Sequence, residues 1–228
     1  MKGYHTMKFS HRSSNGKCRA RGFSLLEMMI VICVMLIVGG IGFMALQPVL
    51  KDGKTNQAFQ SSMMPLRVAR QRAIAERKQY IVCYGIAPPT GALTPIVPTA
   101  QSIQIFRWDA GTALSAAVQV TAVTLPIDFF FQVIPGVPNS AATVPDGFGI
   151  AGNALDLDQG VAGAIKNQVM FMPDGSARDV NGNLNSGILY VARNGDLYSS
   201  RAVTLYGATG RIRGWHLLNS GGPVWIQQ

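Results

Sequence analysis

The chain has few of the side chains that most often perform catalysis or bind metals. It holds three cysteines and three histidines in 228 residues, and the cysteines have no C-x-x-C spacing. Cys18, Cys33 and Cys83 fall in three different segments, so we expect neither a disulfide nor a zinc site. His216 is the only histidine beyond residue 11, which leaves little for a histidine-based triad. We therefore predict no catalytic residues, no cofactor, no metal and no enzymatic activity.

Positive charge is also scarce where a nucleic-acid surface would need it. The formal net charge is +9, but residues 1–22 contribute six basic side chains and no acidic one. From Gln79 to the C-terminus, seven basic residues stand against eight acidic ones. The basic character belongs to an N-terminal leader. The charge balance after it does not favour a general phosphate-binding surface.

Neither charge nor proline occurs between Met28 and Leu46. A helix of about 20 apolar residues crosses the hydrocarbon core of a bilayer. Basic residues precede the run, whereas only Lys51 and Lys54 follow it closely, so the positive-inside rule places the N-terminus in the cytoplasm. The alternative is a cleaved secretory signal. It fits less well, because such apolar regions are roughly 7–15 residues long and Ala45-Leu46-Gln47-Pro48 is a poor cleavage site.

The residues in front of this run carry a motif. Arg21-Gly22-Phe23-Ser24-Leu25-Leu26-Glu27 resembles the cleavage signal of type IV prepilins and type II secretion pseudopilins. The resemblance implies that a membrane-bound prepilin peptidase cuts between Gly22 and Phe23 and N-methylates the new terminal residue, Phe23. It also implies that the apolar run is kept as an assembly helix that joins other pilins or pseudopilins in a filament.

Glu27 is the one charged residue inside the apolar stretch that begins at Phe23. A lone charge costs about 2.5–3.5 kcal/mol at the centre of a membrane helix, and less near its end, so a partner is favoured. Cleavage would create one in the α-amino group of Phe23. Our hypothesis is that Glu27 pairs with this amine on an adjacent subunit and sets the stagger of the filament. The alternative is a glutamate that reaches the membrane interface.

Residues 47–78 are expected to continue the helix as a polar segment, with breaks at Gly53 and Pro65. The stretch 66–78 is strongly helical. The apolar residues expected on one face of it are Leu66, Ala69, Ala73 and Ile74, and the arginines expected elsewhere are Arg67, Arg70, Arg72 and Arg77. The arginines favour the solvated side of an amphipathic helix over a phosphate or lipid contact.

Beyond Gln79 the periodicity changes from helical to extended. The expected strands are 80–84, 101–108, 117–125, 127–134, 168–172, 187–193, 201–206 and 210–217. Asn194-Gly195 is a strong signal for a tight hairpin. Two long loops rich in proline, within 85–100 and at 135–147, are expected to be mobile or to make interactions. A helix followed by several strands indicates an α+β fold.

Two clusters in this region need separate interpretation. Asp179, Asn181, Asn183 and Asn185 place oxygen atoms at alternate positions, as in a calcium loop, but the glycine and acid of an EF-hand are missing. A polar turn is the preferred interpretation. In Gly210-Arg211-Ile212-Arg213, two arginines two apart on a strand point the same way, where they could contact phosphates.

Most of residues 23–78 and 168–215 resemble the GspH/FimT family of pseudopilins, and the middle of the chain matches no motif. The resemblance rests on the alanine and arginine helix end, on Pro173-Asp174-Gly175 and on the Gly-Arg-Ile-Arg segment. In FimT-like minor pilins a Gly-Arg-x-Arg pattern is associated with DNA binding, so Arg211 and Arg213 are the residues for that alternative.

The sequence thus predicts a β-rich, pilin-like head carried on a long N-terminal helix. The expected parts are a cleaved leader at 1–22, a transmembrane helix at 23–46, a periplasmic helical continuation at 47–78 and a globular head at 79–228. We expect a single-pass inner-membrane protein with a periplasmic head, which acts as a minor pseudopilin in type II protein secretion. The alternative is a minor pilin of a type IV pilus that binds DNA.

Overall fold

The computed structural model of the chain describes residues 23–85, 101–150, 152–158 and 167–228. The chain divides into two compact units, Met1–Gln47 and Pro48–Gln228, and each is described by itself. The predicted leader and the proline-rich part of the first loop lie outside the described residues.

One long helix, α1 (Leu25–Glu76), occupies the described part of the first unit and the beginning of the second. The predicted breaks at Gly53 and Pro65 are wrong, because both residues lie inside α1. Pro65 has no N–H and so removes one helical hydrogen bond. The neighbouring side chain of Leu66 is completely buried, and burial of such side chains offsets the lost bond. Arg77, with φ of +52°, follows the last helical residue in a left-handed conformation.

The predicted apolar face of the second half of α1 is largely correct. Leu66, Ala69 and Ala73 are fully buried, whereas Ile74 is 45% exposed. Burial of the first three residues fixes which side of the helix contacts the strands. The arginines of this segment are then left at the margins of the contact.

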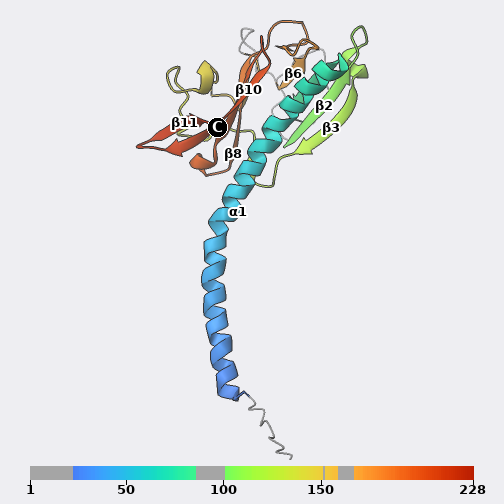
Figure 1. Cartoon of the computed structure of the whole chain (residues 1–228). Helices are drawn as coiled ribbons and strands as arrows, with labels where there is room; N and C mark the ends of the chain where they lie inside the picture. The colour runs from blue at the N-terminus through green and yellow to red at the C-terminus, as the bar shows by residue number, and fades with distance from the viewer. Residues whose placement is uncertain (1–22, 86–100, 151, 159–166) are drawn as a thin grey trace, which may run out of the picture. The chain divides into compact units, whose positions relative to one another are not determined.

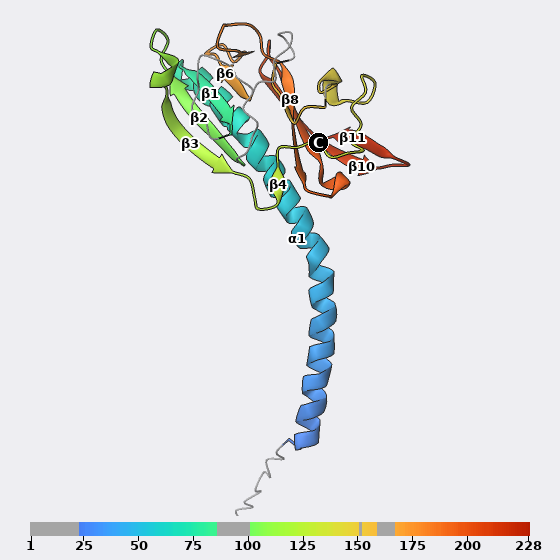
Figure 2. The same ribbon diagram turned by 180° about the vertical axis from the view of Figure 1, so that it is seen from behind.

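The first sheet is antiparallel and has the strand order β3-β2-β1-β6-β7. Its strands are β1 (Gln79–Tyr84), β2 (Ser102–Trp108), β3 (Val118–Thr124), β6 (Gln168–Phe171) and β7 (Ala177–Arg178). A short 3-10 helix, η1 (Leu114–Ala116), precedes β3. The strand β3 lies at one margin of this sheet in both views (Figures 1 and 2).

The second sheet is also antiparallel, with the order β11-β10-β9-β8-β4. Its strands are β4 (Phe129–Phe130), β8 (Gly187–Arg193), β9 (Arg201–Tyr206), β10 (Arg211–Asn219) and β11 (Pro223–Gln227), and β5 (Leu155–Asp156) pairs with β8 beside them. Two 3-10 helices, η2 (Pro145–Gly147) and η3 (Leu197–Ser199), lie in the connections.

The second half of α1 packs against both sheets (Figures 1 and 2). One buried cluster joins Phe59 and Leu66 of the helix to Val82 of the first sheet and Val203 of the second. Gly214 of β10 is part of this fit, because a Cβ there would lie 2.3 Å from Cζ of Phe59. The arrangement confirms the predicted α+β class.

Most of the expected strands are present, but one is wrong and three were missed. Of the stretch 127–134 only Phe129–Phe130 forms a strand, and the two-residue strands β5 and β7 and the strand β11 were not expected. The strands 187–193 and 201–206 pair as predicted. Their connection runs through η3 and is longer than a two-residue turn. Asn194-Gly195 therefore begins a longer loop, in which the Ser199 hydroxyl accepts a bond from the Arg193 N–H at 2.9 Å.

Candidate functional site

The first candidate site is the N-terminal end of α1. The carbonyl of Ser24 accepts the first helical hydrogen bond from the N–H of Met28, at 3.1 Å. Phe23 lies just before the helix and is 71% exposed. Gly22, the other side of the predicted cleavage bond, lies outside the described residues. α1 begins at Leu25, so the predicted cleavage bond precedes the helix by two residues.

Glu27 lies in the first turn of α1. A carboxylate there suits the partial positive charge at the helix N-terminus. No other charged residue occurs in α1 before Lys51. Apolar side chains between Met28 and Leu50 are exposed all around this stretch, and an all-round apolar helix is typical of a membrane span. Among the described residues, α1 is the one helix that is long and apolar enough to cross a membrane.

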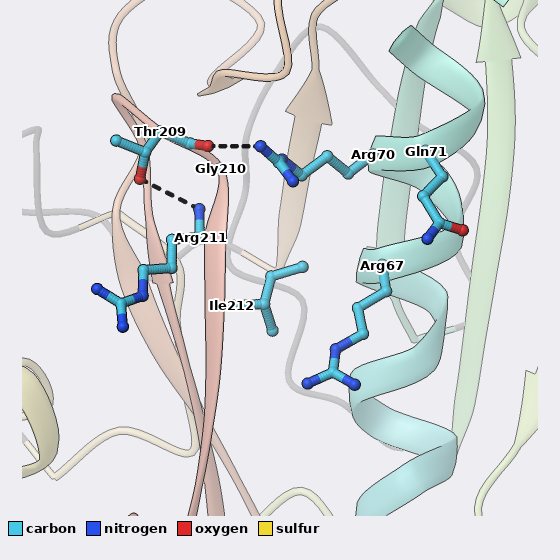
Figure 3. A pocket seen from close by; sticks show the side chains of 7 residues that line it. All are labelled: Arg67, Arg70, Gln71, Thr209, Gly210, Arg211 and Ile212. Atoms are coloured by element: carbon cyan, nitrogen blue, oxygen red, sulfur yellow. Dashed lines mark hydrogen bonds between the residues drawn. The ribbon is translucent and has the colours of Figure 1, made fainter. Parts of the chain in front are cut away.

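The second candidate site is an arginine-lined groove of about 480 Å³ in the second unit. Arg67, Arg70 and Gln71 of α1 form one wall, and the segment from Thr209 to Ile212 forms the other (Figure 3). Three of the lining residues are arginines and none is acidic. A groove of this composition can accept an anion such as a phosphate group.

Arg70 connects the two walls of this arginine-lined groove. Its Nε donates to the carbonyl of Gly175 at 3.2 Å, and its guanidinium Nη2 donates to the carbonyl of Thr209 at 3.0 Å. Gly210 has φ of +60°, and a Cβ there would lie 2.0 Å from the Gly175 oxygen. The Pro-Asp-Gly turn and the Gly-Arg-Ile-Arg segment are thus held together by one guanidinium, and glycine is required at position 210.

The two arginines of the predicted DNA-binding segment differ in their surroundings. Arg211 is exposed and lines the groove. Arg213 pairs with Asp146, with 2.5 Å between Nη1 and the carboxylate oxygen, and its guanidinium lies 5.4 Å from the ring centre of Tyr206. The Asp146 side chain is only 6% exposed. In Figure 3 the Arg211 side chain points away from Arg67 and Arg70 of α1, on the face of β10 opposite to Ile212, while Arg213 has an internal partner.

Asp146 fixes the second proline-rich loop to the second sheet. Its other carboxylate oxygen accepts from the Thr204 hydroxyl at 2.5 Å, and the Trp215 indole N–H donates to the same hydroxyl at 3.1 Å. Burial, together with a hydrogen bond to Asp146, raises the pKa of Tyr206. Sequence reasoning missed Asp146, because a Pro-Asp-Gly segment indicates a turn and gives no sign of an ion-pair partner.

The other polar clusters of the sequence have structural explanations. The Asp179 carboxylate accepts from the backbone N–H groups of Asn181 and Asn183 at 2.9 and 2.8 Å. This is the bonding of a polar turn. No group of three or more potential metal ligands occurs in the part of the chain that the structure describes.

Two single titratable groups of the head are shifted by burial. Burial raises the pKa of Cys83 to about 12. Burial and, to a smaller extent, the neighbouring Arg201 lower the pKa of His216.

Comparison with known proteins bears on the first site. Residues 17–43 match the family model of the prokaryotic N-terminal methylation motif. No curated protein and no solved structure matches the chain. The matched segment includes Gly22, Phe23 and Glu27 and supports a type IV pilin-like or pseudopilin protein. The motif implies processing by prepilin peptidase and assembly with pilin-type subunits, and the apolar helix indicates membrane anchoring.

Proposed function

We propose that this pilin-like chain is a minor pseudopilin of the GspH/FimT type, a structural subunit of the short pseudopilus of type II protein secretion. One observation carries the proposal. The methylation motif, residues 17–43, extends into the apolar part of α1, and Glu27 is the only charged residue of that helix before Lys51. A packed α+β unit, Pro48–Gln228, follows the apolar segment. In this proposal the chain acts by assembly and not by catalysis.

Assembly would depend on the new N-terminus created by cleavage. The α-amino group of Phe23 is positive, and Glu27 is the nearest acidic residue in the sequence. Pairing between adjacent subunits would remove the cost of an isolated carboxylate at the membrane, which is about 2.5–3.5 kcal/mol at a helix centre. The N-terminus would lie on the cytoplasmic side of the inner membrane and the unit Pro48–Gln228 in the periplasm, as the charge asymmetry favours.

The experiment that tests this proposal is made in the organism that encodes the chain. The gene is deleted, and the culture supernatant is compared with that of cells complemented by the natural sequence, Glu27→Gln or Asp52→Asn. Asp52 is the next acidic residue along the chain and serves as the matched control. We expect the deletion and Glu27→Gln to lower the secretion of exported proteins, while Asp52→Asn restores it. Normal secretion by the deletion strain would contradict the proposal.

A second candidate function is favoured by the arginine-lined groove. Arg67 and Arg70 line it from α1, the exposed Arg211 lies on its other wall with the side chain pointing away from them, and no acid lines it. This supports a FimT-like minor pilin that binds DNA through its phosphates. Arg213 would contribute less, because it is paired with Asp146. Outside this groove the unit has no excess of basic residues from Gln79 onward, which is why secretion is the first proposal.

DNA binding is tested with the full-length chain in lipid nanodiscs and a fluorescent DNA duplex. The double variant Arg67→Gln plus Arg211→Gln is compared with Arg77→Gln, an exposed arginine outside the groove. If the groove binds DNA, the double variant should lower the slope of log affinity against log salt by about two, since each phosphate contact contributes roughly 0.9. Equal loss of affinity in the control variant would show only nonspecific attraction and would reject the groove.

A further inference from the structure

One edge of the strand β3 lies next to an apolar groove. Among the described residues, β3 pairs with β2 alone, so this edge has no strand partner there. The groove holds about 290 Å³ and lies between α1 and the two strands. Met64, Pro65 and Val68 line it from the helix, and Ile105, Thr121 and Val123 line it from the sheet. No charged residue occurs in this lining or in Val118–Thr124.

The register shows which backbone groups of β3 are free. Leu125 N–H donates to the carbonyl of Gln101 at 2.7 Å, and this pair is continued by Val123 opposite Ile103. In an antiparallel ladder every second residue bonds to the neighbouring strand. The N–H and C=O groups of Ala122 and Thr124 therefore point away from β2. They form a row of donors and acceptors along the outer edge.

The side chains of β3 complement this row. Thr121 and Val123 alternate with the outward-pointing residues and line the apolar groove. A further strand bonded to Ala122 and Thr124 would place every second side chain on the same face, beside Met64 and Val68. The register shifts between Ile105 and Phe106. This bulge limits regular pairing to the part of β3 from Thr121 onward.

Beyond the bulge, the part of the edge from Thr121 onward lacks side chains that would oppose pairing. Natural edge strands commonly carry lysine, proline or an inward-pointing charge, and β3 has none of these. In the helical wall, Pro65 lacks the N–H that would bond the carbonyl of Ser61 in a regular helix, and both residues line the groove. The groove thus combines apolar walls with backbone groups that accept or donate hydrogen bonds.

We infer that β3 binds an extended segment of a neighbouring pilin-type subunit by strand addition. The segment bonds to Ala122 and Thr124 through its main chain and places uncharged, apolar side chains in the groove at alternate positions. A charged side chain there would lose its hydration without gaining a partner. The neighbour is a pilin-type subunit because the methylation motif implies assembly with such subunits. This inference rests on the proposed filament assembly and adds where a partner binds.

The binding geometry is tested with the full-length chain in nanodiscs and a labelled peptide. The probe alternates valine and threonine between terminal lysines, and the control peptide has the same sequence with N-methylated amides. We expect the unmethylated probe to bind at least about tenfold more tightly than the N-methylated control peptide. Equal binding of the two peptides would refute pairing through the main chain.

Two variants, with Ala122→Val as the control, separate the edge from the groove. Ala122→Pro removes an outward N–H without removing a bond to β2 and should weaken peptide binding about tenfold, whereas Ala122→Val keeps the N–H and should change it less than about twofold. Thr121→Lys places a charge in the groove and should also weaken binding. Tryptophan fluorescence on heating confirms that each variant is folded. If folded Ala122→Pro and Thr121→Lys both bind like the natural chain, the site is rejected.

The occupant is tested by hydrogen exchange on the chain alone and co-assembled with the pilin-type subunits of its own organism. We expect the amides of Ala122 and Thr124 to exchange at least about tenfold more slowly after co-assembly. Unchanged exchange in a verified assembly refutes this inference and leaves the proposed function intact. Failure to co-assemble with any pilin-type subunit refutes the proposed function itself. If the same two amides were protected equally when the purified chain alone is concentrated, the edge would bind a second copy of this chain, and the inference would be overturned.

Discussion

Replacing Arg70 by methionine should destabilise the unit Pro48–Gln228 through two lost hydrogen bonds. The guanidinium donates to the carbonyls of Gly175 and Thr209 at 3.2 and 3.0 Å. Hydrogen bonds from charged donors contribute about 1.5–3 kcal/mol each. The half-buried position of Arg70 favours the lower end for the bond to Gly175, and the exposed bond to Thr209 contributes about 1 kcal/mol. Methionine keeps most of the apolar stem. We therefore expect the free energy of unfolding to fall by about 2–3 kcal/mol.

The assay is thermal unfolding of the full-length chain in nanodiscs, followed by tryptophan fluorescence. All three tryptophans lie after residue 100, so the signal reports on the head. For a domain of this size, about 2–3 kcal/mol corresponds to a decrease in Tm of roughly 5–10 °C. Arg67→Met is the matched control, because Arg67 lies one turn away on the same helix and is exposed. Its Tm should change by less than about 2 °C. Equal changes in both variants would refute the bridging role of Arg70.

Three further predictions concern single positions in the head. Gly214→Ala should lower the free energy of unfolding by about 2 kcal/mol, measured by the same assay, because the new Cβ would lie 2.3 Å from Cζ of Phe59. Unchanged stability would mean that the ring moves freely. Cys83 of the folded chain should resist maleimide at pH 8, since a pKa of about 12 leaves about one thiolate in 10⁴. Its labelling in the folded chain should increase as the pH is raised, and unfolding should make it reactive at pH 8. Asp146→Asn should lower the free energy of unfolding by about 1–3 kcal/mol, because it leaves Arg213 without its carboxylate partner; a stability equal to that of the natural chain would contradict this.

The sequence predicted those elements whose signal is local. Alternation of apolar and polar residues located β2, and β-branched runs located β8 and β9. Pro65 misled the prediction because the cost of a proline is local, whereas the burial that offsets it comes from strands far along the chain. The strand β11 was missed because it begins at a proline after two glycines, a composition typical of loops.

The candidate sites also divide into one with a local sequence signal and one that depends on long-range contacts. The motif around Gly22 and Glu27 is contiguous, and its recognition needs no tertiary structure. The arginine-lined groove is assembled from α1 and a segment about 140 positions later, so the sequence could name Arg67, Arg70 and Arg211 but could not show that their segments meet. Likewise, no local pattern pairs Asp146 with Arg213, which lie 67 positions apart. Whether an arginine of this region can bind an anionic ligand depends on ion pairs of this kind, which the sequence does not show.

The long sequence separation between the helix and its contacts has a consequence for synthesis. Arg70 contacts Gly175 and Thr209, which follow it by 105 and 139 positions, and Phe59 contacts Gly214 later still. At about 5–20 residues per second, the ribosome needs on the order of ten seconds to supply these partners. Throughout that interval the apolar side of α1 lacks its second sheet. A chain that ends before Gly187 would lack β8, β9, β10 and β11 and would leave this surface without its second sheet, so the last fifth of the translated chain decides whether the apolar side of α1 is buried.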